Sequence, residues 1–278
     1  MIDFIGIGAQ KSGTSWVYAC LYEHPEICAP MKEIHFFSRP RFEKGRVWYE
    51  SHFKKCERGT KMGEFSTSYL YSEEAPARIK SQYPDVKIIA ILRNPITRAY
   101  SQYRNAIKAG EIPESLSFER FIIQEKSVIA QGKYAEQLKR YYALFPPEHI
   151  LTLVYEDIEK DPLAFMKRIY TFIGIDASFV PTMLHTSVNS ARTPRRVYID
   201  RIMHQSAEFL RRNGFDRFVW SIRKWGIPDV VRALNTKHTV KVVTAPYDRK
   251  KLADVFRNDA HHLIEYCGRD MVKEWNLE

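Results

Sequence analysis

The segment from Phe4 to Trp16 constrains the fold of this chain more than any other. It reads Phe-Ile-Gly-Ile-Gly-Ala-Gln-Lys-Ser-Gly-Thr-Ser-Trp: a short apolar strand, a loop of small residues with one lysine, and the start of a helix. Such a loop presents backbone N–H groups and the positive end of a helix to an anion. The segment therefore predicts an anion-binding cradle, and the alternative is an ordinary strand-to-helix turn. The donors that it offers are Lys11, Ser12, Gly13, Thr14 and Ser15.

A nucleoside triphosphate is the first anion to consider for this cradle. A Walker-type loop has a glycine, four further residues, and then Gly-Lys-Ser/Thr. Gly8 and Gly13 have this separation, but Thr14 stands where the lysine belongs. Lys11 comes two residues before the second glycine. The position of the lysine therefore does not fit a nucleoside triphosphate loop.

Apolar runs and helical patterns alternate along the first two thirds of the chain. Strands are expected at Phe4–Gly8, Lys87–Leu92 and Ile150–Tyr155, and helices at Trp16–His24, Asn94–Ala109 and Asp161–Gly174. This alternation predicts an α/β fold, a single domain with a central parallel sheet flanked by helices. Ligands of such sheets bind at the carboxyl ends of the strands. Lys11 and Arg93 both follow an expected strand, so one shared site is predicted.

The length and composition suit a single domain spanning residues 1–278. No internal repeat or linker is evident, and no run of 18 apolar residues indicates a membrane span. Met1 is followed almost at once by the first strand, so neither a signal peptide nor a membrane anchor is expected. A cytoplasmic protein is therefore predicted. The four cysteines show no metal-binding spacing and are expected to be reduced structural thiols: Cys20, Cys28, Cys56 and Cys267.

The net charge of +10 is concentrated in the last third of the chain. Between Arg192 and Arg257 there are 16 Lys and Arg residues against 6 Asp and Glu residues, a surplus that equals the whole net charge. This basic segment is expected to be mainly helical from about residue 192. Its charge could attract a polyanionic cofactor, an acceptor or nucleic acid. A solvated, arginine-rich helical face is the alternative.

Two motifs resemble those of the sulfotransferases that use 3′-phosphoadenylyl sulfate (PAPS). Lys11-Ser12-Gly13-Thr14-Ser15 is similar to their 5′-phosphosulfate loop, and Leu92 to Ser101 is similar to their 3′-phosphate motif. In the second motif Arg93 ends a strand and Ser101 follows eight residues later. An ATPase would place a magnesium-binding carboxylate there, whereas arginine offers two donors to a phosphate. The resemblance implies a P-loop-kinase-like sulfotransferase fold, PAPS as the sulfuryl donor, and no metal.

A third motif resembles the heparan-sulfate-type branch of this family and its bacterial relatives. The residues are Lys32-Glu33-Ile34-His35-Phe36-Phe37. The resemblance implies that Glu33 is the general base and that His35 positions the acceptor or tunes Glu33. His35 is also a competitor for the base, since cytosolic members use histidine. A surface glutamate beside a loop histidine is the structural alternative. Ser38 stands where those relatives often have aspartate, which puts the wider polar network in doubt.

The remaining expected contacts come from weaker similarities. Trp16 stands where cytosolic members have a tryptophan that contacts adenine, although a core position is equally compatible with the sequence. Arg192 lies in Ser-Ala-Arg-Thr-Pro, the nearest match to a late loop that closes over the nucleotide. Phe65 replaces a lysine that several glycan-modifying members carry, which weakens the case for a heparan-like acceptor.

The sequence therefore predicts transfer of a sulfuryl group from PAPS to a hydroxyl or amine. A saccharide, a lipid or a small secondary metabolite fits as acceptor, and a cytoplasmic small molecule is favoured. A nucleotide kinase or NTPase of similar fold is one alternative. A basic nucleic-acid-binding protein is another, but no recognition motif accompanies the charge, so no nucleic-acid partner is expected. The sequence indicates neither the oligomeric state nor the acceptor.

Overall fold

The computed structural model describes residues 2–38, 40–185, 193–194, 236–237 and 249–278. These residues divide into two compact units. The first comprises the described residues within Met1–Ala99, Lys126–Val188 and Asp248–Glu278, and the second those within Tyr100–Glu125 and Asn189–Tyr247. The single-domain expectation stays a prediction. The basic segment from about residue 192 lies mostly outside the described residues.

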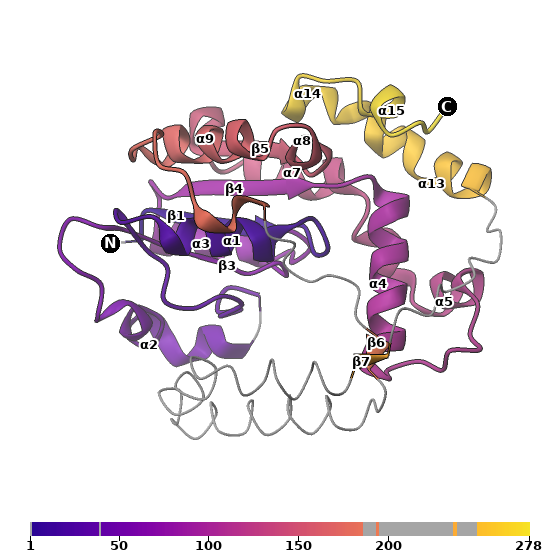
Figure 1. The fold of residues 1–278 in the computed structure, drawn as a ribbon, viewed down its shortest axis with the longest axis horizontal. Helices are drawn as coiled ribbons and strands as arrows, with labels where there is room; N and C mark the ends of the chain where they lie inside the picture. The colour runs from indigo at the N-terminus through magenta and orange to yellow at the C-terminus, as the bar shows by residue number, and fades with distance from the viewer. Residues whose placement is uncertain (1, 39, 186–192, 195–235, 238–248) are drawn as a thin grey trace. The chain divides into compact units, whose positions relative to one another are not determined.

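A five-stranded parallel sheet forms the first unit's centre (Figure 1). The strand order is β2-β3-β1-β4-β5, and every neighbouring pair is parallel. Ile88 to Leu92 are all buried, so both faces of β4 are covered. This confirms the predicted α/β fold. The strands are β1 (Phe4–Gly8), β2 (Ile27–Cys28), β3 (Lys61–Phe65), β4 (Lys87–Leu92) and β5 (Ile150–Val154).

Glycines and phenylalanines on facing strands hold β1 and β3 in register. Phe4 is paired with Gly63, and Gly6 is paired with Phe65. A Cβ on Gly63 would lie 2.5 Å from the Phe4 ring, and one on Gly6 would lie 2.0 Å from the Phe65 ring. Each ring therefore occupies the space that a side chain on the opposite strand would need. This register fixes where β3 ends relative to the loop that follows β1.

Helices α1 (Thr14–Glu23) and α9 (Pro162–Ile173) contribute to the main hydrophobic core. Val17 and Leu21 of α1 pack with Ile169 of α9 and with Ile89 of the sheet. The Asp161 carboxylate caps α9 by accepting from Ala164 N at 2.9 Å. Gly174 ends the helix with a φ of 84°. The sequence-based bounds of both helices are thus correct to within a few residues.

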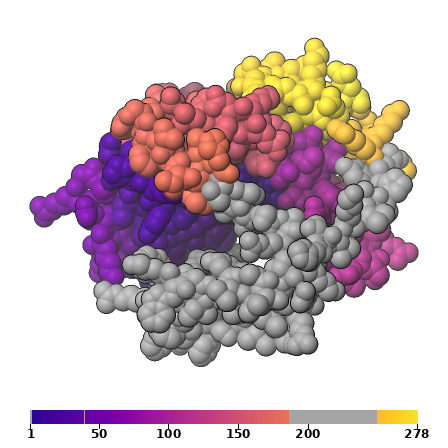
Figure 2. All heavy atoms as spheres, in the orientation of Figure 1, coloured from indigo at the N-terminus to yellow at the C-terminus, as the bar shows by residue number. Residues whose placement is uncertain are grey.

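The other helices of the first unit cover the sheet and its edges (Figure 1). The yellow C-terminal helices lie beside rose and orange helices of the same unit in Figure 2. Asp259 accepts hydrogen bonds from Ala135 N and Glu136 N, and Arg269 pairs with Asp157. These helices are α2 (Gly45–Glu50), α3 (Ala75–Gln82), α6 (Lys126–Ala130), α7 (Tyr134–Tyr142), α8 (Glu156–Lys160), α13 (Arg249–His262), α14 (Ile264–Cys267) and α15 (Met271–Glu274), with short 3-10 turns η1 (Pro40–Lys44), η2 (Ser51–Phe53), η3 (Pro147–His149) and η4 (Thr182–His185).

The second unit contains a small aromatic cluster. Helix α4 (Pro95–Ala109) begins in the first unit and ends in the second, which also contains α5 (Phe118–Gln124). The Tyr103 ring lies 5.5 Å from those of Phe118 and Phe121. Two short antiparallel strands, β6 (Thr193–Pro194) and β7 (Thr236–Lys237), belong to the same unit.

The expectation of four reduced cysteines is wrong for two of them. Cys28, at the end of β2, forms a disulfide with Cys56, which follows η2. The two residues are 28 apart in sequence, and their Cα atoms lie 5.6 Å apart because the chain returns to the same edge of the sheet. Cys20 and Cys267 are free, and burial raises the pKa of each thiol to about 12. These two are therefore poor nucleophiles at neutral pH.

Removing the disulfide is expected to lower the free energy of unfolding. A cross-link that closes a loop of this length restricts the unfolded chain and typically contributes about 2–4 kcal/mol. The double variant Cys28→Ser/Cys56→Ser should unfold at a correspondingly lower urea concentration than the wild type. Wild-type protein treated with reductant is the control and should approach the variant. Equal unfolding free energies for the oxidised, reduced and variant forms would contradict this expectation.

Candidate active site

The predicted cradle lies between β1 and α1, at the carboxyl edge of the sheet. Gly13 immediately precedes α1 with a φ of 76°, and Lys11 also has a positive φ, 68°. Non-glycine residues rarely adopt this conformation. The first turn of α1 has no acidic residue, and no side chain caps it through a hydrogen bond. The positive end of α1 is therefore not neutralised by the helix's own residues.

Two residues of the cradle suit it to an oxygen-rich anion. A Cβ on Gly13 would lie 2.9 Å from the Tyr155 ring, so the close packing there requires glycine. Ser12 is fully buried, and its Oγ has no hydrogen-bond partner within the part of the chain that the structure describes. A buried hydroxyl without a partner is costly. A phosphate oxygen would supply the missing acceptor.

Arg93 follows β4 and lies at the side of the cradle. Its Nη1 donates to the Lys11 carbonyl oxygen at 2.9 Å, and its Nε donates to Thr97 Oγ1 at 3.2 Å. The guanidinium lies 4.4 Å from the centre of the Tyr155 ring. Tyr134 of α7 donates its hydroxyl to the Arg93 carbonyl oxygen at 2.8 Å. The fold thus brings Lys11 and Arg93, 82 residues apart, to one place.

The segment that carries Glu33 and His35 runs beside the end of β3. Glu33 has a φ of 62° and His35 a φ of 54°, both in the left-handed region. The Glu33 N–H donates to the Phe65 carbonyl oxygen at 2.8 Å. We call residues 32–36 the base loop. Its unusual backbone aims the Glu33 side chain back toward the residues that follow β3.

Donors surround the Glu33 carboxylate on several sides. Thr67 donates its backbone N–H to Oε2 at 3.0 Å, and its hydroxyl lies 3.1 Å from Oε1. Lys32 Nζ is 3.0 Å from Oε1, and His35 Nε2 is 3.1 Å from Oε2. The side chain is still 29% exposed, so an acceptor could reach it. This arrangement holds a carboxylate in one orientation while leaving it accessible.

A row of hydroxyl groups continues from His35. His35 Nδ1 lies 2.6 Å from Ser68 Oγ, which lies 2.5 Å from Ser38 Oγ. Ser38 is the residue for which the sequence put the polar network in doubt. Two serine hydroxyls form that network here. The carboxylate, imidazole and hydroxyls thus form one hydrogen-bonded chain from Glu33 to Ser38.

Lys32 connects the base loop to the cradle. Its Nζ donates to Ser15 Oγ at 3.1 Å as well as contacting Glu33. Ser15 belongs to the first turn of α1. The same lysine side chain therefore contacts both the carboxylate predicted to be the base and a residue of the predicted anion site. Lys11, Glu33 and Arg93, which come from three separate motifs, thus lie at the same carboxyl edge of the sheet, beside the ends of β1, β3 and β4.

The sequence of this chain also matches a known family model. The model is described as a sulfotransferase domain, and it matches residues 2–218. The chain belongs to the sulfotransferase family.

Relatives within the sulfotransferase family include enzymes named for heparan sulfate. The chain is 35% identical over 176 residues to heparan sulfate glucosamine 3-O-sulfotransferase 3B1 of Mus musculus, covering 61% of this chain and 45% of that protein. It is 32% identical over 193 residues to the bifunctional heparan sulfate N-deacetylase/N-sulfotransferase 3 of Homo sapiens, covering 62% of this chain and 22% of that protein. The chain thus spans less than half the length of either relative.

A solved sulfotransferase structure shares the fold over nearly the whole chain. The crystal structure of a sulfotransferase from Alicyclobacillus acidocaldarius superposes with a TM-score of 0.71 and covers 99% of both chains at 24% sequence identity. This likeness confirms the predicted sulfotransferase fold.

The described residues do not place three of the predicted nucleotide contacts beside the cradle. Trp16 is buried, packs against Phe165 in the core, and donates its indole N–H to the Met183 carbonyl oxygen at 3.2 Å. Ser101 lies on the part of α4 that belongs to the second unit, so its position relative to Arg93 is not described. Arg192 lies outside the described residues. The roles of all three stay predictions.

Sequence reasoning missed several residues that shape this candidate site. Lys32, Thr67 and Ser68 contact the predicted base or its histidine, and Tyr155 stacks on Arg93. Thr67 and Ser68 follow Phe65 closely in the sequence, but none of the three motifs includes them. Small polar residues such as these are common in loops, so the sequence does not indicate that they contact Glu33 and His35. Their role becomes visible only in the structure, where the base loop lies beside β3.

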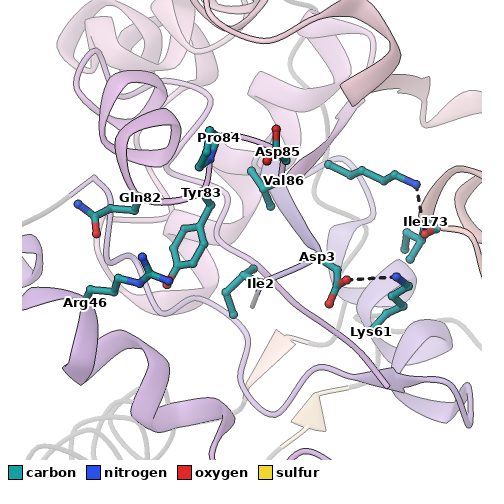
Figure 3. Close-up of a pocket in the computed structure, with 11 residues that line it drawn as sticks. Ile2, Asp3, Arg46, Lys61, Gln82, Tyr83, Pro84, Asp85, Val86 and Ile173 are labelled. Atoms are coloured by element: carbon teal, nitrogen blue, oxygen red, sulfur yellow. Dashed lines mark hydrogen bonds and ion pairs between the residues drawn. The ribbon is translucent and has the colours of Figure 1, made fainter. Parts of the chain in front are cut away.

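A cavity of about 300 Å³ lies at the opposite, amino-terminal edge of the sheet (Figure 3). Both lysines that line it have partners: Lys61 contacts Asp3 at 3.2 Å, and Lys87 Nζ donates to the Phe172 carbonyl oxygen at 2.6 Å. None of the residues proposed for sulfuryl transfer lines this cavity, which is therefore separate from the candidate site. Among the described helices, none is both long and apolar enough to cross a membrane.

Proposed function

We propose that this chain transfers a sulfuryl group from PAPS to a hydroxyl or amine of an acceptor. The observation that carries the proposal is the Lys32 bridge, in which one ammonium contacts both Glu33 and Ser15. This bridge connects two groups: the Glu33 carboxylate, which could accept a proton, and the cradle, which could hold PAPS. Membership of the sulfotransferase family supports this reading of the site.

The cradle would hold the 5′-phosphosulfate of the donor. The unpartnered Ser12 hydroxyl and the uncapped start of α1 fit a group that offers only acceptor oxygens. Lys11 and the loop N–H groups would stabilise the negative charge that develops on the leaving phosphate oxygen. Arg93 would bind the 3′-phosphate, together with Ser101. Trp16 and Arg192 remain proposed contacts of the nucleotide.

Glu33 would act as the general base. As the acceptor oxygen or nitrogen attacks sulfur, its proton passes to a Glu33 carboxylate oxygen. The bond between sulfur and the bridging phosphate oxygen breaks, and its electron pair leaves with adenosine 3′,5′-bisphosphate. His35 contacts the same carboxylate and would orient it, with Ser68 fixing the imidazole ring. No step of this scheme requires a metal, and that absence is itself part of the proposal.

A small molecule or an unsulfated saccharide is the proposed acceptor. Phe65, which replaces the lysine of several glycan-modifying relatives, is fully buried and lies 6.4 Å from the Phe4 ring. This position therefore contributes to the core and presents no charge to a sulfated sugar. The Glu33 carboxylate is contacted by the Thr67 hydroxyl, the His35 imidazole and the Lys32 ammonium, and this ammonium is already shared between Glu33 and Ser15. These surroundings suit a neutral acceptor.

Incubation of the protein with radiolabelled PAPS and pools of candidate acceptors would test the proposed function. Label should pass to an acceptor, and a chelator should leave the rate unchanged. A parallel incubation with magnesium and labelled ATP should give no transfer. Magnesium-dependent ATP turnover, without binding of adenosine 3′,5′-bisphosphate, would contradict the proposal and favour a kinase. Salt-sensitive binding of nucleic acid in place of nucleotide binding would favour the remaining alternative.

A further inference from the structure

A buried carboxylate lies directly behind the base loop. Glu64 is on β3, where its side chain is fully buried. The two hydroxyl groups nearest to it are Ser66 Oγ, 2.6 Å from Oε2, and the Tyr69 hydroxyl, 2.6 Å from Oε1. The Tyr49 hydroxyl is farther away, 3.4 Å from Oε1. Glutamate side chains are almost never fully buried unless they have partners, and here the partners are hydroxyl groups.

Each of the two close hydroxyls also receives a hydrogen bond from the base loop. The His35 N–H donates to Ser66 Oγ at 2.9 Å, and the Phe36 N–H donates to the Tyr69 hydroxyl at 2.9 Å. Each hydroxyl therefore accepts from a loop amide and donates to one oxygen of Glu64. Two consecutive backbone amides of the base loop are thus connected to the same carboxylate.

The base loop needs such support because its backbone is unfavourable. Glu33 and His35 both have a positive φ, which costs a non-glycine residue of the order of 1–2 kcal/mol each. A conformation of this kind persists only where surrounding contacts fix it. The Phe65 carbonyl oxygen holds the Glu33 amide. The two hydroxyls bonded to Glu64 hold the amides of His35 and Phe36.

The ionisation of Glu64 bears on how well it can hold both hydroxyls. Burial raises the pKa of Glu64, the hydrogen bonds from Ser66 and Tyr69 lower it, and the nearby Glu33 carboxylate raises it; together these effects place the pKa at about 7. The titratable groups that face it are Glu33, Tyr49 and Tyr69. Only an ionised carboxylate accepts from both hydroxyls without itself donating.

We propose that Glu64 is a positioning residue that holds the base loop in its catalytic conformation through Ser66 and Tyr69. The expected effect of Glu64 on turnover rests on the proposed role of Glu33 as the base. The expected effect of Glu64 on the base loop is independent of that role, because the hydroxyls bonded to Glu64 contact the backbone amides of the loop. The two parts can therefore be measured separately.

Glu64→Gln is the first test. An amide has one acceptor oxygen, so one of the two hydroxyls must lose its acceptor in a fully buried site. Hydrogen exchange of the His35 and Phe36 amides should become roughly tenfold faster, as local opening becomes easier. The kcat should fall roughly 10–100-fold, the scale expected when a catalytic group is displaced by about 1 Å. The affinity for adenosine 3′,5′-bisphosphate should stay unchanged.

Two further variants separate positioning from a general loss of stability. Ile79→Val removes one buried methyl group on α3 and should leave both the exchange of the base loop and kcat unchanged. Ser66→Ala removes the bridge to His35 while keeping Glu64. If Glu64 acts through Ser66, the fold decrease in kcat of the double variant Ser66→Ala/Glu64→Gln should be much smaller than the product of the fold decreases of the two single variants.

Unchanged exchange of the His35 and Phe36 amides in Glu64→Gln would overturn the proposal. So would turnover per nucleotide-binding site equal to that of the wild type, or single losses that multiply in the double variant. If Glu64→Gln does not fold, Tyr69→Phe provides the same test, because it removes only the hydroxyl that joins Phe36 to Glu64. If the wild type transfers no sulfuryl group, the proposed function fails, and amide exchange alone decides the role of Glu64.

Discussion

Glu33→Gln is expected to lower kcat by roughly 10²–10⁴, the range usual for loss of a general base. Glutamine has nearly the same shape and can still accept from Thr67, but it cannot take a proton from the acceptor. Binding of adenosine 3′,5′-bisphosphate should remain near that of the wild type, because the cradle and Arg93 are untouched. Turnover with labelled PAPS and calorimetric titration with the nucleotide would measure the two effects.

His35→Gln is the control that decides between the two candidate bases. His35 contacts Glu33 through Nε2 and Ser68 through Nδ1, so its role in the proposed mechanism is to orient the carboxylate. Its loss should therefore lower kcat less than Glu33→Gln does. If His35→Gln is the more damaging change, and Glu33→Gln keeps most of its turnover, then histidine is the base.

Arg93→Ala is expected to weaken binding of adenosine 3′,5′-bisphosphate by roughly 10–150-fold. This follows from about 1.5–3 kcal/mol for a hydrogen bond to a charged group. Adenosine 5′-phosphate should lose much less affinity, because it lacks the 3′-phosphate that Arg93 is proposed to bind. Titration of both nucleotides into the variant and the wild type would measure the difference.

Two matched changes make the Arg93 experiment specific. Lys11→Ala should weaken both nucleotides similarly, since both carry a 5′-phosphate. Arg93→Lys keeps the charge but removes the paired donors of the guanidinium, so it should recover only part of the lost selectivity. Equal losses for the two nucleotides in Arg93→Ala would show that Arg93 acts through its contact with the Lys11 carbonyl oxygen.

The strands that the sequence predicted are those with continuous apolar runs. Those at Lys87–Leu92 and Phe4–Gly8 match the structure residue for residue, and the one at Ile150–Tyr155 ends one residue earlier. Strand β3 was missed because Lys61, Gly63 and Glu64 break any apolar pattern. Its buried glutamate accepts hydrogen bonds from the hydroxyls of Ser66 and Tyr69, which follow the strand. The disulfide was missed for a similar reason, since a separation of 28 residues reveals nothing about proximity.

The sequence predicted those residues of the candidate site that belong to recognisable motifs. Lys11, Arg93 and Glu33 were found because lysine, arginine and glutamate stand at marked positions of three short motifs. The placing of Lys32 between Glu33 and Ser15 depends on positive φ angles in the base loop, which no residue pattern indicates. The same is true of Thr67, whose backbone N–H provides one of its contacts with Glu33.

The strand order of the sheet has a consequence for how acceptor preference could change. Neighbouring strands lie about 4.8 Å apart, so β3 and β4, on either side of β1, are separated by about 10 Å. The proposed base Glu33 lies beside the end of β3, the cradle follows β1 and Arg93 follows β4, so the incoming and departing partners would lie on opposite flanks of one strand. Substitutions where β2 and β3 meet could thus change which acceptor is sulfated, while the proposed nucleotide contacts at the ends of β1 and β4 stay as they are.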